Sequence, residues 1–283
     1  MTSMTETEAT KKKSAGRNLP VAITVGLLLG AAVLASLFIR REAFIVFTII
    51  ACALALYEIR VALKKRNIFT PMVPLHVGSI GILVSAYSAG GEALLVSTAL
   101  TAGGILVWRV LDGGGLTAVR DAAGGMFAVA YIPFMAGFVM LMLAEPNGPF
   151  RVFTFIALAV ANDVGGYIMG SQFGRHPLAP SVSPKKSWEG LVGSLVFASI
   201  VGALLGYSLF HGQWKFGLVL AGASVVAATL GDLSESLIKR DLRIKDMSSL
   251  IPGHGGVLDR LDSLLFTAPA AFLVMELMLP VAT

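Results

Sequence analysis

Long apolar stretches make up most of this chain, and short polar connections separate them. A helix needs about 20 apolar residues to cross the hydrocarbon core of a bilayer, because each residue advances about 1.5 Å along the helix axis. Nine stretches approach that length: residues 19–39, 43–63, 72–89, 92–111, 123–143, 151–171, 189–210, 215–231 and 263–281. The pattern therefore predicts about nine transmembrane helices.

The composition also indicates a protein that lives in lipid. The 283 residues are 55% hydrophobic and only 14% charged, whereas a soluble domain carries about 25% charged residues. Inside a bilayer only helices and closed barrels satisfy their backbone groups, and these apolar runs are far longer than the strands of a barrel. The expected fold class is all-α, that of a polytopic integral membrane protein. Residues 1–18 are expected to be a disordered cytoplasmic tail, and residues 19–283 a single transmembrane domain.

Basic residues predict the orientation. The chain holds 22 lysines and arginines and has a formal net charge of +5. Of these basic residues, 18 lie on the side of the amino terminus. The four on the opposite side are Arg40, Arg41, Arg151 and Lys215. Because cytoplasmic connections carry an excess of lysine and arginine, we expect a cytoplasmic amino terminus in a plasma (inner) membrane. Orientation explains the positive charge, so no nucleic acid is expected as a partner.

A first polar segment begins near the inner end of the sixth predicted helix. Asp163 lies within that helix, where a carboxylate costs about 2.5–3.5 kcal/mol on insertion scales and usually serves a function. The alternative is a carboxylate that reaches the interface or pairs with a lysine. Downstream, Pro184 prevents helix before Lys185 and Lys186, and Ser187 is placed to cap the next helix. Two lysines beside a helix amino terminus suit a phosphate group, although an ordinary basic loop would read the same way.

A second polar segment is denser. Asp232, Glu235, Ser236 and Lys239 follow at i, i+3, i+4 and i+7, so they share one face of the eighth predicted helix. The polar and glycine residues that come next are Arg240, Lys245, Asp246, Pro252-Gly253-His254-Gly255-Gly256, Asp259, Arg260 and Asp262. Carboxylates that hold Mg²⁺, cations that neutralise a polyphosphate and a glycine loop that approaches a ligand closely are what phosphoryl chemistry needs. Any single charge here could equally belong to a solvated loop.

Other signals are weak or absent. The sequence has no Gly-Lys-Ser/Thr phosphate loop, no two-histidine metal helix and no nucleophile elbow. Residues 112–121 are interpreted as a glycine-rich inner loop. Glu58, near the end of the second predicted helix, is an intramembrane charge whose role the sequence leaves open.

The second segment closely resembles a family signature. The residues that carry the resemblance are Ser236-Leu237-Ile238-Lys239-Arg240, Lys245-Asp246 and the run from Pro252 to Asp262. The resemblance is to the phosphatidate cytidylyltransferase (CDP-diacylglycerol synthase) family, with the spacing intact. The stretch from Asn162 to Gly190, with its Ser-Pro-Lys-Lys element, is similar to a further block of that family. The resemblance covers roughly residues 155–265.

The resemblance implies an enzyme that transfers CMP from CTP to phosphatidic acid and releases pyrophosphate, using Mg²⁺. No general base is required, because the lipid phosphate is already ionised. A second cation and a homodimer remain open. The implied catalytic residues are Asp259, Asp232, Lys239, Asp246, Asp163 and Asp262. The implied substrate-binding residues are Lys185, Lys186, Arg240, Lys245, His254, Gly255, Gly256, Arg260 and Ser183. The implied metal ligands are Asp163, Asp232, Asp246, Asp259 and Asp262.

Two other classes of function remain as alternatives. A CTP-dependent kinase of a polyprenol or phytol would use the same nucleotide in the same membrane, but would transfer the γ-phosphoryl group. A transporter would place charges near the middle of the membrane on paired half-helices, whereas the charges here collect toward one face.

Overall fold

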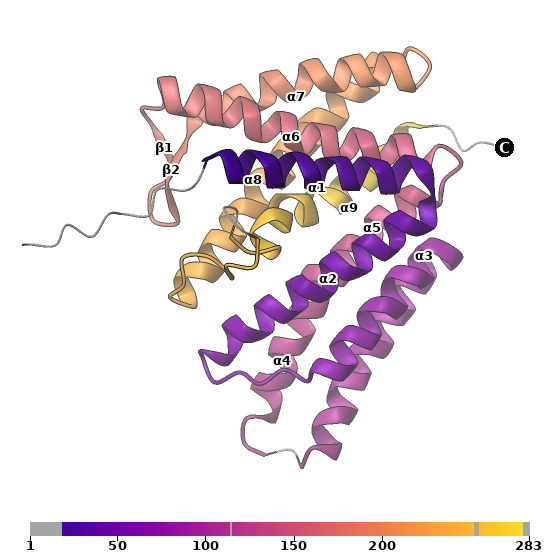
Figure 1. The fold of residues 1–283 in the computed structure, drawn as a ribbon, viewed down its shortest axis with the longest axis vertical. Coiled ribbons are helices and arrows are strands. Elements are labelled where there is room, and N and C mark those ends of the chain that lie inside the picture. Colours follow the sequence, from indigo (N-terminus) through magenta and orange to yellow (C-terminus); the bar gives the residue numbers. More distant parts are fainter. Residues whose placement is uncertain (1–18, 114, 252–254, 280–283) are drawn as a thin grey trace, which may run out of the picture.

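The computed structural model describes residues 19–113, 115–251 and 255–279, and helices make up most of them (Figure 1). The predicted tail, residues 1–18, lies outside the described residues. The helices are α1 (Leu19–Ile39), α2 (Arg41–Lys64), α3 (Met72–Leu111), α4 (Ala118–Val129), η1 (Ala130–Phe134), α5 (Met135–Ala144), α6 (Gly148–Phe173), α7 (Trp188–Leu209), α8 (Trp214–Asp241) and α9 (Leu258–Met278). The all-α expectation for a polytopic membrane protein is confirmed.

The number of helices that cross a membrane stays a prediction. Within the described part of the chain, seven helices are long and apolar enough to do so, and α1 adds a shorter apolar helix over Thr24–Ile39. The ranges 72–89 and 92–111 both fall within α3, which is non-helical at Gly90 (φ 80°). The two halves fold back on each other there, since the Ser85 hydroxyl donates a 2.9 Å hydrogen bond to Ser97 Oγ.

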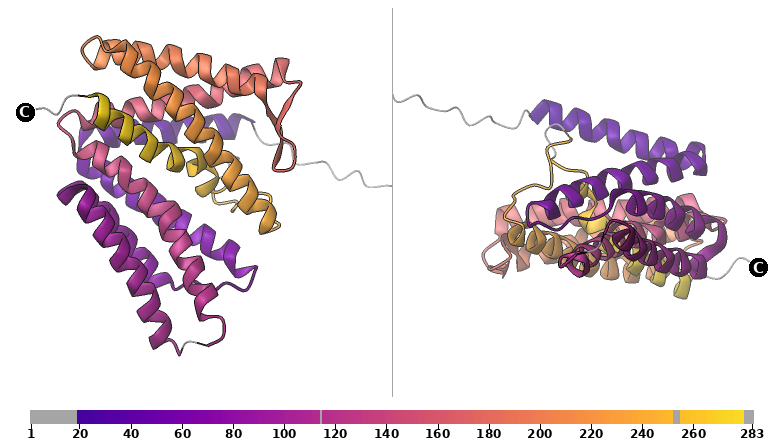
Figure 2. Two further views of the ribbon diagram at one scale, coloured as in Figure 1. Left: turned by 180° about the vertical axis from the view of Figure 1, so that it is seen from behind. Right: turned by 90° about the horizontal axis from the view of Figure 1, so that it is seen from below.

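Two groups of helices form the molecule. α6 packs against α7, α7 against α8 and α8 against α9, while α2, α3, α4 and α5 form the other side (Figures 1 and 2). Small residues permit the closest approaches: a Cβ on Gly165 would lie 2.5 Å from the Gly193 carbonyl oxygen, and one on Gly166 2.7 Å from Ser194 Oγ. Close backbone contact of this kind is how helices associate in lipid.

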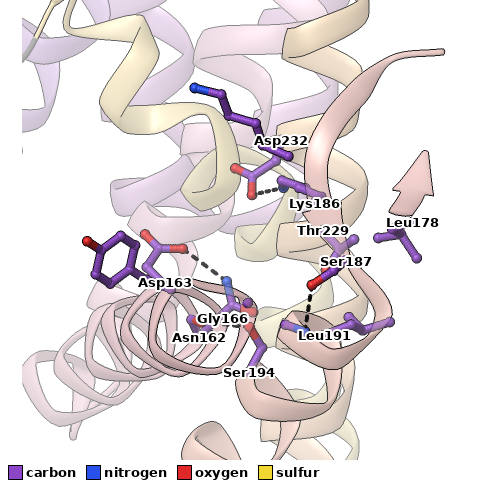
Figure 3. A pocket seen from close by; sticks show the side chains of 14 residues that line it. Asn162, Asp163, Gly166, Leu178, Lys186, Ser187, Leu191, Ser194, Thr229 and Asp232 are labelled. Atoms are coloured by element: carbon purple, nitrogen blue, oxygen red, sulfur yellow. Dashed lines mark hydrogen bonds and ion pairs between the residues drawn. The ribbon is translucent and has the colours of Figure 1, made fainter. Parts of the chain in front are cut away.

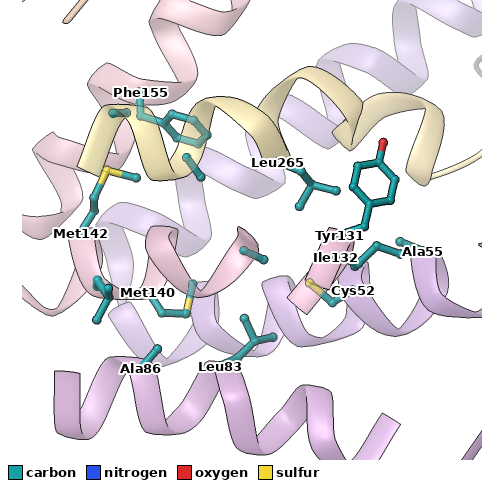
Figure 4. Packing of buried hydrophobic residues seen from close by; sticks show 14 of the residues in the cluster. Cys52, Ala55, Leu83, Ala86, Tyr131, Ile132, Met140, Met142, Phe155 and Leu265 are labelled. Atoms are coloured by element: carbon teal, nitrogen blue, oxygen red, sulfur yellow. The ribbon is translucent and has the colours of Figure 1, made fainter. Parts of the chain in front are cut away.

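The apolar interior lies where the two groups meet. Cys52 of α2, Leu83 of α3, Ile132 of η1, Phe155 of α6 and Leu265 of α9 are all buried in one cluster (Figure 4). The outer surface is also apolar, with exposed large side chains that include Leu27, Leu100, Val110, Leu204 and Leu277. A surface of this kind suits lipid rather than water.

One element departs from the helical pattern. β1 (Pro177–Ala179) and β2 (Ser183–Ser187) form a short antiparallel hairpin between α6 and α7. Pro184 lies within β2, as expected of a residue that prevents helix. Ser187 caps α7, because its Oγ accepts a 3.1 Å hydrogen bond from the Gly190 N–H. The predicted cap is therefore confirmed, and the hairpin holds the two lysines beside the start of α7.

Candidate active site

A polar cavity of about 310 Å³ opens between α6, the β hairpin, α7 and α8 (Figure 3). Most of its lining is small or polar: Asn162, Asp163, Gly166, Gly170, Lys185, Lys186, Ser187, Gly190, Ser194, Thr229 and Asp232. Both predicted polar segments therefore contribute to one cavity. Lys186 of β2 forms an ion pair with Asp232 of α8 across it.

Helix packing positions the α6 side of this cavity. The Ser194 hydroxyl of α7 donates a 2.7 Å hydrogen bond to the Asn162 carbonyl oxygen, and this bond is buried. The Asn162 amide in turn donates a 3.0 Å hydrogen bond to the Asp163 carboxylate (Figure 3). Asp163 is thus oriented by its neighbour toward the cavity that holds Lys186.

Two contacts fix the hairpin that carries the lysines. Arg240, at the end of α8, donates a 2.5 Å hydrogen bond to the Ser181 carbonyl oxygen in the turn between β1 and β2. Glu189, in the first turn of α7, accepts hydrogen bonds from the backbone N–H groups of Arg175 and His176 and contacts the His176 ring at 2.6 Å. Sequence reasoning did not single out Glu189, whose partners lie 13 and 14 residues upstream.

Further along α8, a buried ion cluster lies at its contact with α9. Lys239 Nζ lies 2.5 Å from Glu235 and 2.9 Å from Asp259, and both carboxylates are almost fully buried. The Asp259 carboxylate also accepts a 2.8 Å hydrogen bond from the Gly256 N–H and 3.1 Å bonds from the Met247 N–H. Asp259 therefore holds both ends of the loop that precedes α9, as well as Lys239.

Glu58 of α2 holds the same loop from the other side. Its buried carboxylate accepts a 2.6 Å hydrogen bond from the Ser248 hydroxyl and bonds of 2.9 and 2.8 Å from the N–H groups of Val257 and Leu258. A carboxylate at a helix amino terminus is stabilised by the unpaired N–H groups there. Its signal in the sequence was a charge within an apolar helix, but its partners are about 200 residues away.

The loop has little room beside these carboxylates. Gly255 has φ +89°, a conformation that favours glycine. A Cβ on Gly256 would lie 2.8 Å from Glu58 and 3.0 Å from Asp259. The two glycines thus allow the close approach of the backbone that the sequence predicted. The groups that this backbone approaches are carboxylates of the protein itself.

Asp262 of α9 lies near both the Lys186–Asp232 ion pair and the buried cluster around Lys239. Its carboxylate is an electrostatic neighbour of Asp232 and of Glu235, which lie one turn apart on α8. Glu235 shares the predicted polar face of α8 but was not among the expected site residues. Its Oε1 is buried without a hydrogen-bond partner, as is Asn162 Oδ1.

The remaining expected residues lie less close to the cavity. Ser183 begins β2 outside the cavity lining. Lys245 and Asp246 are exposed on the loop after α8, and Arg260 is exposed on the first turn of α9, near Asp163. His254 lies outside the described residues.

Metal binding at these carboxylates stays a prediction. In the ranges that the structure describes, no three histidine, cysteine or carboxylate side chains gather as a metal site. Lysines pair with the carboxylates instead: Lys186 with Asp232, and Lys239 with Glu235 and Asp259. The carboxylates of Asp163 and Asp232 and the unpartnered amide oxygen of Asn162 line one cavity and are oxygen donors of the type that Mg²⁺ prefers, so these residues fit such an ion.

Comparison with known proteins identifies the family to which this sequence is similar. The sequence matches the cytidylyltransferase family over residues 20–278. A Mycobacterium leprae protein named phosphatidate cytidylyltransferase is 36% identical over 279 residues, covering 93% of this chain and 89% of the relative. A Mycobacterium bovis protein of the same name is 33% identical over 283 residues, covering 95% and 92%. One from Pseudomonas aeruginosa is 39% identical over 183 residues, covering 64% and 67%.

Proposed function

This chain belongs to the cytidylyltransferase family, and from that membership we propose that its polar cavity joins CTP to phosphatidic acid, giving CDP-diacylglycerol and pyrophosphate. One observation of the structure carries the proposal furthest: Lys186 and Asp232 meet across the cavity from two different polar segments of the sequence. Cation and carboxylate thus lie together beside membrane-spanning helices, where a lipid phosphate and a nucleotide can both arrive.

The reaction needs positioning and charge neutralisation rather than a base. An oxygen of the phosphatidate phosphate attacks the α-phosphorus of CTP, a new P–O–P bond forms, and the bond between the α- and β-phosphates breaks. The electron pair leaves with pyrophosphate. The attacking oxygen is already ionised, so no proton has to be removed, and preorganised cations lower the barrier by stabilising the charge that develops.

Lys185 and Lys186 are proposed to bind the polyphosphate, because both line the cavity at the start of α7. The unpaired N–H groups of a helix amino terminus add to the attraction for an anion. Lys239 is held by two buried carboxylates, which fixes its position. We assign to Asp259 and Glu58 the positioning of the loop before α9.

We propose Mg²⁺ as the cofactor, held by the cavity carboxylates of Asp163 and Asp232, with the carboxylates of Asp262 and Glu235 as electrostatic neighbours. When bound, such an ion neutralises phosphate charge and polarises a phosphoryl oxygen. A second cation is compatible with this number of carboxylates. Asp163, Asp232 and Asp262 are like-charged neighbours with only Lys186 paired among them in the described part of the chain, and the repulsion between them supports a further cation there.

The cellular setting is a proposal as well. The distribution of basic residues supports a cytoplasmic amino terminus in the plasma (inner) membrane, with the two polar segments facing the cytoplasm, where CTP is made. A homodimer remains compatible with the extended apolar surface. Residues 19–283 are proposed to act as one transmembrane catalytic domain.

Product analysis tests the proposal. Purified protein is incubated with CTP, Mg²⁺ and phosphatidate, and the released nucleotide and phosphate species are separated. Pyrophosphate in equal amount to CDP-diacylglycerol is the expected result. Release of CDP would show a lipid kinase, and a folded protein that forms no CDP-diacylglycerol would contradict the proposal.

A further inference from the structure

A second cavity lies away from the active site. It has a volume of about 230 Å³ and is formed by α2 and the connection from α2 to α3. Its lining residues are Tyr57, Arg60, Val61, Lys64, Ile68, Phe69 and Thr70. None of them lines the polar cavity between α6 and α8, so a ligand here would be separate from the substrates.

Two cations face this cavity without a carboxylate. Arg60 and Lys64 lie four residues apart on α2, so their side chains are neighbours on one helix face. Over the described ranges, neither forms an ion pair. Arg60 donates to the Thr70 carbonyl oxygen at 3.3 Å and contacts Met72 Sδ at 3.7 Å. Like charges at this spacing repel, and an anion between them would remove that cost.

A polar group in the wall also lacks a partner. Thr70 is 4% exposed, and its Oγ1 is buried without a hydrogen bond. A buried hydroxyl without a partner costs about 1–3 kcal/mol. A phosphate oxygen in the cavity would accept the hydrogen bond that this hydroxyl can donate. Two cations and one free hydroxyl together match a phosphate group.

The rim of the cavity distinguishes a lipid from a free ion. Tyr57, Val61 and Phe69 are 46%, 39% and 49% exposed. Aromatic and basic residues side by side are typical of the level of lipid head groups. Inorganic phosphate would gain nothing from these apolar side chains, whereas the glycerol and acyl chains of a phospholipid would cover them.

We propose that this cavity binds the phosphate head group of an anionic phospholipid, at a site separate from the one that performs the reaction. Arg60 and Lys64 neutralise the phosphate, Thr70 donates a hydrogen bond to it, and Tyr57, Val61 and Phe69 contact the lipid body.

Photochemical labelling tests this site without any turnover. The full chain is placed in phosphatidylcholine nanodiscs with a small fraction of phosphatidylglycerol that carries a diazirine near its head group. After irradiation, labelled peptides are identified by mass spectrometry. We expect labelling within residues 57–72, and no comparable labelling when the diazirine is carried by phosphatidylcholine.

Two adjacent lysines supply the matched variants. Both lysines are exposed, but only Lys64 lines the cavity. Lys64→Gln should lower labelling of this segment about fivefold, the effect of one cation near an anionic lipid, and Lys65→Gln should leave it within about twofold of wild type. Thr70→Val, which keeps the charge, should also lower it.

Three results would overturn the proposal. Equal losses in Lys64→Gln and Lys65→Gln would show a general surface attraction. Displacement of the labelled lipid by inorganic phosphate at the same concentration would show a site for the free ion. Labelling of residues 57–72 that is unchanged in folded Lys64→Gln and Thr70→Val proteins would show that the cavity does not select its ligand.

Discussion

Glu58 of α2 accepts a 2.8 Å hydrogen bond from the backbone N–H of Leu258, the first residue of α9, although 200 residues separate them. The same carboxylate bonds to Val257 and Ser248. The loop before α9 is thus held by a helix from the other half of the molecule. The position of this loop beside α8 and α9 therefore depends on the position of α2.

Replacing Glu58 should loosen this loop without touching a substrate. Glu58→Gln removes the negative charge and turns an amide NH₂ toward N–H donors, so we expect a loss of about 1–3 kcal/mol in stability and a lower kcat. Hydrogen exchange measured over residues 247–258 should become faster. Glu42→Gln, an exposed glutamate on the same helix, is the control. Unchanged exchange in Glu58→Gln would contradict the role.

Asp259 is expected to matter for turnover. Asparagine offers one acceptor oxygen, whereas the carboxylate accepts from Lys239, Met247 and Gly256. By analogy with the loss of one preorganised electrostatic group, Asp259→Asn should lower kcat about 10²–10³-fold. Steady-state kinetics with phosphatidate in mixed micelles measures this. A folded Asp259→Asn protein with near-normal kcat would show that turnover does not depend on the hold of this carboxylate on Lys239 and on the loop before α9.

Removing divalent cations should abolish activity. A triphosphate and a lipid phosphate repel each other strongly, and Lys186, one of the two lysines that line the cavity, is already paired with Asp232. Turnover in excess EDTA should fall to background and return on addition of Mg²⁺, while the melting temperature shows that the protein stays folded. Full turnover in EDTA would refute the proposed metal.

The topology can be tested by cysteine labelling, because Cys52 is the only cysteine in the sequence and is buried. In a Cys52→Ala background, Lys65→Cys should react with an impermeant reagent only from the cytoplasmic side, and Pro146→Cys only from the outside. Both positions are exposed. The nearby Gly148 would not suit this test, because it has no room for a side chain. Labelling of Pro146→Cys from the cytoplasm alone would reverse the predicted orientation.

The sequence predicted most helices because lipid imposes a length and a composition on each of them. It also predicted the Ser187 cap, which depends on local residues alone. The β hairpin could not be predicted, since Ser183-Pro-Lys-Lys-Ser187 shows no alternation of apolar and polar residues. The π-helical segment Ala130–Phe134 around Pro133 was likewise hidden within an apolar stretch.

The site was predicted in its residue types more than in its contacts. Asp163, Lys186 and Asp232 were expected to act together, and the structure brings them to one cavity. The pairing of Lys239 with Glu235 follows from their spacing on a helix, but its pairing with Asp259 requires the packing of α8 on α9. Glu58 gained its role only from tertiary contact, so its charge alone could not reveal it.

The central claim is that the cavity at Asp232 transfers the cytidylyl group of CTP to a lipid phosphate. Purified protein, phosphatidate and Mg²⁺ are supplied with CTP labelled with ³²P at either the α- or the γ-phosphate, and radioactivity is measured in the lipid extract. The α label should enter the lipid and the γ label should not. Asp232→Asn should lose this incorporation, while Asp241→Asn, an exposed aspartate on the same helix, should retain it. Entry of the γ label, or equal incorporation by Asp232→Asn and wild type, would contradict the account.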